Sequence, residues 1–563
     1  MPRLFAITVY GVTALFFALF FVYPIWHTVQ EAFWTPDGIT FAFVGEVFKN
    51  PLYLEGLWNS LLMGVFSTLL CLVIALPLAL ISNTWRFPGK GLLNSLILVP
   101  LILPPFVGAL GIRQILGQSG ALNTLLTHLG LMDANAPFDW LGEGQLFGVV
   151  VMNALHLYPI AYLNISAALA NLDPAMEEAA ENLGCTGVRR LFRVTFPLIM
   201  PGVFAGATII FIWAFTELGV PLVFDYSKVT SVQIFHGIKD LSGNPFPYAL
   251  VVVLLVCTVA LYLLGKFFFG RDNFASSGRA STGRQLRTPS PLVGWLCSGA
   301  FLVVLFLAVL PHLGVILLSV SGDWYRSILP NEWTGQHYQD ALGHPLTVNS
   351  IGNSLKYASL STLFDIILGI SVAYVVVRTK LPGRQILDAM AMLPLAVPGL
   401  VLAFGYLAMT RQGAAFDWLI LGEDPIVILV IAYAVRRLPY VVRSAAAGFQ
   451  QTSVSLEEAA QNLGCPPLKA IRKITLPLIA ANLIAGGLLA FSFAMLEVSD
   501  SLILAEQTQH YPITKAIYAL ISTLGTGPNL AAALGVWAMI FLAVTIIGAG
   551  VILGQKLGAL FRV

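Results

Sequence analysis

The chain has 563 residues, of which 57% are hydrophobic and only 10% are charged. Soluble domains carry about 25% charged residues, so this composition excludes a soluble protein and indicates a chain that has lipid as its solvent. The formal net charge of +2 gives no reason to expect a nucleic-acid partner. The five cysteines lack metal-ligand spacing, so we expect reduced thiols and neither a disulfide framework nor a metal site.

Apolar segments long enough to cross a bilayer, roughly 20 residues each, recur along the chain. The first six lie near residues 4–24, 57–82, 92–112, 146–168, 198–220 and 248–269. The next six lie near residues 292–319, 353–377, 387–409, 425–448, 478–500 and 531–555. No small-x-small cleavage site follows the first segment, so we interpret it as a retained span. The sequence predicts an all-α membrane protein with 12 transmembrane helices.

The distribution of positive charge predicts the orientation of these spans. With the N-terminus inside, 19 of the 30 lysine and arginine residues fall in cytoplasmic segments and eight fall outside. Positive residues concentrate on the cytoplasmic side of membrane proteins. We therefore expect a multi-pass membrane protein with both termini in the cytoplasm.

The two sets of six spans are copies of one another. Asn59-Ser60-Leu61 matches Asn353-Ser354-Leu355 at a shift of 294 residues, and Ser67-Thr68-Leu69 matches Ser361-Thr362-Leu363 at the same shift. A segment rich in Ser, Gly and Arg, residues 271–291, separates the copies and is typical of a flexible linker. The sequence predicts two units, 1–270 and 292–563, which are parallel because each holds an even number of spans.

The strongest part of the repeat is polar. EEAAENLGCTGVRRLFRVTFPLI begins at Glu177, and EEAAQNLGCPPLKAIRKITLPLI begins 280 residues later, with 12 of 23 positions identical. Asp173 is a good N-cap for the first copy, and Ser453 or Ser455 for the second, where Ser455 and Glu458 would form a capping box. Each glycine of the repeat can end its first helix. We therefore expect a helix–turn–helix over 173–197 and another over 453–477.

These loops resemble the EAA loop of binding-protein-dependent ABC importer permeases, whose pattern is Glu-Ala-Ala, a glycine and a closing I-x-L-P. Ile474 and Leu476 match the closing pattern, while Val194 and Phe196 depart from it mildly. The resemblance implies two fused MetI-like permease repeats of six helices. It also implies a partner ABC ATP-binding subunit at each loop, two copies in all, and an extracytoplasmic solute-binding protein. The coupling residues that it implies are Glu177, Glu178, Ala179, Ala180, Gly184, Pro197, Glu457, Glu458, Ala459, Ala460, Gly464 and Pro477.

The chain has no P-loop pattern G-x-x-x-x-G-K-[ST], and we find no pattern typical of a catalytic nucleophile or metal site. We therefore expect no enzymatic activity and no cofactor in this chain, with ATP held by the partner subunits. Membrane lipid is the remaining expected partner.

Several ionisable residues fall within or near the predicted spans, where they are costly and mark functional sites by default. Arg436 and Arg437 lie in one span, and Glu217, Glu497 and Asp500 lie near the ends of others. One interpretation is that they line the translocation path or its outer gate, together with His156. The other is structural: Arg436 or Arg437 forms an interior ion pair with Glu497, and His156 is a satisfied interior histidine.

The cargo is inferred from resemblance to other fused permeases. Fused permeases of this kind resemble those for ferric iron, and similar fusions serve thiamine and 2-aminoethylphosphonate; the stretch FTELGVPLVF after Trp213-Ala214 also resembles the ferric-iron group. We expect ferric iron as the cargo. The alternative class is a 12-span secondary transporter, in which the two repeated polar loops would have no function.

Overall fold

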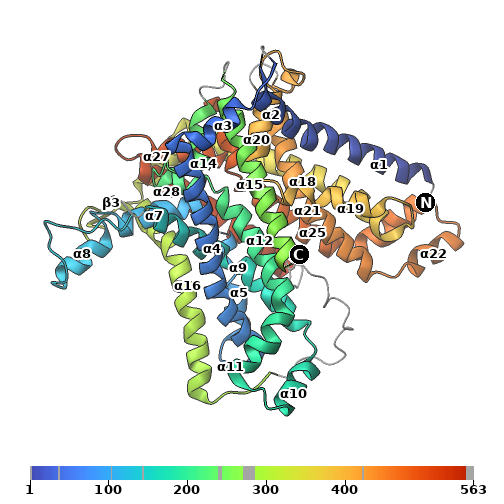
Figure 1. Cartoon of the computed structure of the whole chain (residues 1–563), viewed down its shortest axis with the longest axis horizontal. Helices are drawn as coiled ribbons and strands as arrows, with labels where there is room; N and C mark the ends of the chain where they lie inside the picture. The colour runs from blue at the N-terminus through green and yellow to red at the C-terminus, as the bar shows by residue number, and fades with distance from the viewer. Residues whose placement is uncertain are drawn as a thin grey trace. The chain divides into compact units, whose positions relative to one another are not determined.

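The structure is a computed structural model that describes residues 3–35, 38–102, 104–141, 145–238, 244–269, 286–420 and 424–552. Both chain ends and most of the predicted linker 271–291 lie outside these ranges. The described chain is mostly helical, as Figure 1 shows. Two short antiparallel sheets pair β1 (Trp34–Thr35) with β2 (Gly38–Ile39) and β3 (Ser321–Asp323) with β4 (Glu332–Trp333).

The main helices before the linker are α1 (Arg3–Phe17), α2 (Tyr23–Phe33), α3 (Ala42–Lys49), α4 (Pro51–Thr84), α5 (Lys90–Leu96), α6 (Val99–Ile102), α7 (Pro105–Leu116), α8 (Ala121–His128), α9 (Gln145–Ala170), α10 (Pro174–Asn182), α11 (Gly187–Arg190), α12 (Phe196–Phe215), α13 (Gly219–Val223), α14 (Thr230–Gly237) and α15 (Phe246–Phe269). After the linker come α16 (Pro291–Ser319), α17 (Gln336–Gly343), α18 (Pro345–Arg378), α19 (Arg384–Met392), α20 (Gly399–Met409), α21 (Ile426–Gln451), α22 (Ser455–Asn462), α23 (Pro467–Ala470), α24 (Leu476–Leu478), α25 (Ala480–Met495), α26 (Ser499–Leu504), α27 (Ile513–Ile521) and α28 (Gly527–Ile552).

The structure confirms a mostly helical fold and most of the predicted spans. Within the described ranges, eight helices are long and apolar enough to cross a membrane, and three bent helix pairs raise the number to 11 if each pair is one span. The remaining predicted span, 425–448, coincides with the 26-residue helix α21. That helix carries Arg436, Arg437 and Arg443. These three charges exclude it from the helices that are apolar enough to be identified as spans by composition alone. The number twelve therefore stays a prediction.

The third span of each half is broken at a proline. Lys90–Leu101 and Pro105–His128 meet at 92°, and Arg384–Leu395 and Gly399–Met409 meet at 94°. Pro104 and Pro398 precede the second helix of each pair, with ψ of 124° and 135°. Proline disrupts an ongoing helix because it lacks the N–H and clashes with the preceding turn. The break is thus encoded at the same place in both copies.

Matched elements of the two halves have matched lengths. Helices α4 and α18 each have 34 residues, and α9 and α21 each have 26. Both loops contain a single π-helical turn at the same position of the repeat, Leu191–Thr195 and Ile471–Thr475. The repeat seen in the sequence is therefore a structural repeat.

The compact units of the structure exchange segments between the two halves of the sequence. We call Pro51–Gln233 with Val256–Thr334 the first-repeat unit. The second-repeat unit consists of Gly335–Val563 with Met1–Asn50 and Ile234–Leu255. Helix α1 thus belongs with the second repeat and α16 with the first. The boundaries 1–270 and 292–563 describe the sequence repeat and stay a prediction.

Each unit has its own helical core (Figure 1). In the first-repeat unit, α4, α9 and α12 pack together. Helix α7 approaches α16 so closely that a Cβ on Gly111 would lie 1.9 Å from the carbonyl oxygen of Pro311, so only glycine fits there. In the second-repeat unit, α18, α21 and α25 pack together. Helix α1 joins α18 through the rings of Phe16 and Phe364, whose centroids are 5.0 Å apart.

Candidate functional sites: the repeated loops and a buried charge cluster

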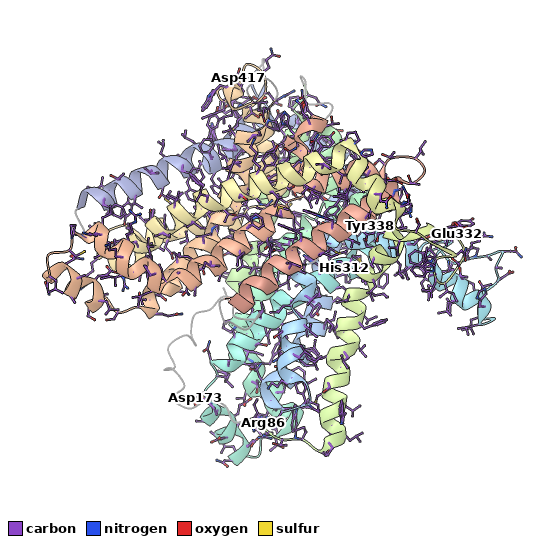
Figure 2. All side chains as sticks on the ribbon, turned by 180° about the vertical axis from the view of Figure 1, so that it is seen from behind. Arg86, Asp173, His312, Glu332, Tyr338 and Asp417 are labelled. Carbon is purple, nitrogen blue, oxygen red and sulfur yellow. The ribbon has the colours of Figure 1, made fainter. Side chains whose placement is uncertain are left out.

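The first repeated loop is a helix–turn–helix, as predicted. Asp173 caps α10 through its Oδ1, which accepts a hydrogen bond from the backbone N–H of Ala175 at 3.0 Å. Gly184 ends the turn with φ of 77°, in the left-handed region that favours glycine. Figure 2 labels Asp173 at the same end of the first-repeat unit as Arg86, which follows α4. The loop thus lies at the end of the unit where α4 finishes.

The second loop repeats this design with a different cap. The predicted capping box of Ser455 and Glu458 is wrong, because α22 begins at Ser455 itself and Val454 takes the N-cap position without a side-chain hydrogen bond. Ser453 instead accepts the backbone N–H of Ser455 on its Oγ at 3.3 Å. Gly464 ends the turn with φ of 86°.

One glutamate in each loop braces the loop from inside. Thr195 donates its hydroxyl hydrogen to Oε1 of Glu177 at 2.6 Å, and Thr475 donates to Oε1 of Glu457 at 2.9 Å. The two glutamates are 6% and 4% exposed. Each threonine closes the π-helical turn that leads into the next span. These bonds therefore hold the first helix of each loop against the start of the span.

Each loop also has ionic contacts, and these differ between the two loops. In the second loop, Nε of Arg378 lies 3.4 Å from Oε1 of Glu457, and both side chains are buried. In the first loop, Glu181 pairs with Arg190 and with Arg287, whose Nη2 lies 3.0 Å away. The hydrogen bond from Arg287, aided by both positive charges, lowers the pKa of Glu181. The corresponding position of the second loop is Gln461, which has no charge to pair.

The loops expose a matched set of other side chains. Glu178 and Glu458 are exposed, as are Ala179, Ala459, Pro197 and Pro477, whereas Ala180 is buried and Ala460 is half-buried. Leu183 is 88% exposed and Leu463 is 90% exposed. Each loop thus exposes a leucine at the equivalent position of the repeat.

We expect the Thr195→Val substitution to loosen the first loop without unfolding the chain. Losing a buried hydrogen bond to a carboxylate costs about 1.5–3 kcal/mol, which is about 10- to 150-fold in local opening. Backbone amides of α10 should exchange hydrogen faster by that factor. Thr475→Val should have a smaller effect because Arg378 still faces Glu457. The exposed Thr186→Val is the matched control, and equal exchange in all three variants would contradict the brace.

The charged side chains near the middle of α21 form a buried cluster with two carboxylates that follow α25. Arg436 and Arg437 both donate hydrogen bonds to Glu497, and Arg436 also lies 3.5 Å from Oδ2 of Asp500. Glu497 is 4% exposed and Asp500 is fully buried. The interior ion pair considered from the sequence is therefore present, with both arginines on one glutamate. A buried pair of this kind is strongly destabilised when one partner is removed.

The two other predicted side chains lie in the first-repeat unit and have different surroundings. Glu217 accepts the backbone N–H groups of Gly219 and Val220 at 3.0 and 3.2 Å, so it caps the short helix α13. Nδ1 of His156 lies 2.7 Å from the carbonyl oxygen of Pro100, which confirms the interpretation of a satisfied interior histidine. Glu217 and Glu497 match in sequence, and each accepts a side-chain hydroxyl on its backbone carbonyl oxygen, from Ser231 at 2.6 Å and from Thr514 at 2.7 Å.

Sequence reasoning missed several members of these sites. Thr195 and Thr475 were visible as an identical pair in the repeat, and only their burial was unknown. Asp365, fully buried in α18, falls within the predicted span 353–377, so its charge was itself a signal. The sequence does not show what it faces. Among the described residues, no three His, Cys, Asp or Glu side chains gather closely enough to hold a metal ion.

Comparison with known proteins places these sites in a family. The family model described as binding-protein-dependent transport system inner membrane component matches residues 72–271 and 365–551, more than half of the chain. The ferric transport system permease protein FbpB of Actinobacillus pleuropneumoniae is 27% identical over 507 residues, covering 85% of this chain and 69% of that protein. A putative ferric transport permease of Haemophilus influenzae is 28% identical over 508 residues, covering 85% and 75%.

A shorter relative carries a different name. The putative 2-aminoethylphosphonate transport system permease protein PhnU of Salmonella typhimurium is 26% identical over 254 residues, which is 45% of this chain and 88% of that protein. The family match occurs twice, once in each repeat, and includes both loops. The chain therefore belongs to the binding-protein-dependent inner membrane components, and it is a permease of an ABC importer with two permease repeats in one polypeptide.

Proposed function

We propose that the chain forms the path of a ferric-iron importer and that each repeated loop receives one ABC ATP-binding subunit. The observation that carries the docking proposal is the matched exposure of Leu183 and Leu463 beside Glu178 and Glu458. A rigid helix with an exposed leucine and an exposed glutamate suits a groove on a partner. The internal braces of Glu177 and Glu457 support this role because they transmit a push on the loop to the next span.

Ferric iron is proposed as the cargo because relatives that cover 85% of this chain carry that name. The described residues hold no cluster of metal ligands, and a conduit that releases its cargo rapidly does not need one. The solute-binding protein outside the membrane would then select the cargo. The shorter match to PhnU supports 2-aminoethylphosphonate as the second candidate; nothing in the structure favours thiamine.

We propose that the cluster around Glu497 lies on or beside the path and rearranges as the importer switches. Arg436, Arg437 and Asp500 belong to this cluster, and Glu217 and His156 mark the corresponding region of the first repeat. Ionisable groups within a membrane protein are costly and are kept for function. The ATP would be hydrolysed by the partner subunits, and this chain would hold no cofactor of its own.

Purification from the native membrane in mild detergent tests the assembly. About two copies of a P-loop ATPase per chain are expected, together with a soluble binding protein whose ligand identifies the cargo. A chain that purifies alone and moves solute in proteoliposomes without ATP would instead be a secondary transporter.

The double substitution Glu178→Lys with Glu458→Lys tests the docking faces. Both side chains are exposed, so the variant should insert and fold normally while its affinity for the ATPase falls about tenfold or more through charge reversal. Co-purification and thermal unfolding measured on the same sample separate the two effects. The matched control is Glu506→Lys, because Glu506 is an exposed glutamate that lies outside both loops. Unchanged ATP-driven transport in the double variant would refute the docking proposal.

A further inference from the structure

Among the described residues, Asp365 is a buried carboxylate in the same unit as the charge cluster whose two oxygens have no hydrogen-bond partner. It lies on α18 and is fully buried. Within the described chain, neither of its carboxylate oxygens accepts a hydrogen bond. Burying a carboxylate with no hydrogen bond and no ion pair is strongly unfavourable. We therefore looked for a cation that could pair with Asp365 in another conformation of the protein.

The candidate partner on the helix that packs against α18 is Arg437. The crossing of α18 and α21 fixes their register, because a Cβ on Gly369 would lie 2.8 Å from Cγ1 of Val441. One helical turn earlier on each helix are Asp365 and Arg437. The two helices are the second and fourth spans of their half and so cross the membrane in the same direction.

Arg437 has a donor to spare. Its Nη2 donates to Glu497, whereas its Nε has no partner among the described residues, although the side chain is only 7% exposed. A guanidinium presents five N–H donors in a fixed fork. The same side chain can therefore turn from a carboxylate beyond α25 to one on α18 without leaving the protein interior.

The first repeat supplies an internal comparison. At the shift of 294 residues, 365 − 294 = 71, so Asp365 corresponds to Cys71, a neutral side chain whose thiol donates to the carbonyl oxygen of Ala154 at 3.6 Å. At the shift of 280 residues, 437 − 280 = 157, so Arg437 corresponds to Leu157. The negative and the positive charge are thus both present in the second repeat and both absent from the first. The two residues behave as a pair.

We infer that Asp365 is a second anchor for Arg437, whose guanidinium pairs with Glu497 in the arrangement seen here and with Asp365 in the alternate state of the importer. When α25 and the Glu497 segment shift against α18 and α21, the guanidinium of Arg437 exchanges one carboxylate for the other. The arginine therefore stays paired in both states. Arg436 stays with Glu497 and Asp500, so those carboxylates are not left alone. Asp365 is a positioning residue in this scheme. The inference rests on the proposed importer function.

Asp365→Asn is the test, because asparagine has the same shape and cannot form the ion pair. The complex of this chain with its ATPase and binding protein is reconstituted in liposomes. Two quantities are measured: the amount of ATPase bound, and the stimulation of ATP hydrolysis by the binding protein, which does not require the cargo to be known. We expect ATPase binding to be unchanged and the stimulation to fall at least tenfold. Asp365→Glu should restore it to within about threefold of the wild type.

Cys71→Ala is the matched control at the equivalent position and should remain within twofold of the wild type. If Asp365→Asn also remains within twofold, Asp365 is a neutral packing residue and the inference is wrong. If Asp365→Asn does not assemble, Asp365→Cys takes its place, because it copies the neutral residue of the first repeat and leaves Arg437 on Glu497. It should assemble and lack stimulation; stimulation at the wild-type level would overturn the inference. A wild-type complex without any ATP hydrolysis would refute the proposed function instead.

Discussion

Replacing Leu183 and Leu463 together with aspartate should abolish stable binding of the ATPase. The two leucines are 88% and 90% exposed in the free chain. Burying a leucine contributes about 1.5–3 kcal/mol, and an aspartate in its place must lose its hydration without gaining a partner. Affinity at each loop should therefore fall at least about 100-fold. Each single variant should retain one ATPase per chain, and the double variant should retain none.

Native mass spectrometry of the purified complexes counts the bound subunits directly. Leu524→Asp is the matched control, because Leu524 is 97% exposed but lies between α27 and α28, outside both loops. That variant should bind two ATPases like the wild type. A double variant that still binds two would show that the ATPase contacts another part of the chain.

Replacing Glu497 with alanine should cause the largest loss of stability of any single substitution in the cluster. It removes the carboxylate that both Arg436 and Arg437 contact and leaves Asp500 beside Arg436. Breaking a buried ion pair in this way costs about 3–5 kcal/mol. Less protein should accumulate in the membrane, and the purified chain should unfold at a markedly lower temperature in detergent.

The first repeat provides the control for this variant. Glu217→Ala removes the matched glutamate. Its carboxylate accepts hydrogen bonds from the backbone N–H groups of Gly219 and Val220. Backbone groups left unsatisfied cost about 1–3 kcal/mol, so the loss should be smaller. Equal losses for the two variants would mean that the arginines do not depend on Glu497.

The elements that the sequence predicted best are those whose signal is local. Apolar length gives the spans, and proline and glycine at fixed places give the broken third span and the turn at Gly184. The capping box at Ser455 was wrong because helix starts are uncertain by a residue or two, and a cap depends on the exact start. Local patterns therefore predict the elements more reliably than their ends.

The site residues that could be predicted from the sequence are mainly those that occur in both copies of the repeat. Glu178 and Glu458 stand out as duplicated, but the burial of the neighbouring Glu177 and Glu457 depends on threonines 18 residues away. The pairing of Arg437 with Glu497 spans 60 residues. The relation of Asp365 to both depends on how three helices pack. Contacts between distant residues are tertiary, and no periodicity in one sequence encodes them.

The exchange of α1 between the halves has a consequence for biosynthesis. Phe5 and Phe16 pack on Tyr374 and Phe364, and Tyr10 donates a hydrogen bond to the carbonyl oxygen of Pro382. At about 5–20 residues per second, a ribosome needs roughly 15–70 s to reach those partners. During that interval the first span waits in the membrane with its packing face covered only by lipid or by the insertion machinery. The chain therefore cannot complete its second-repeat unit from either end alone, because α1 packs only after α18 has been synthesised.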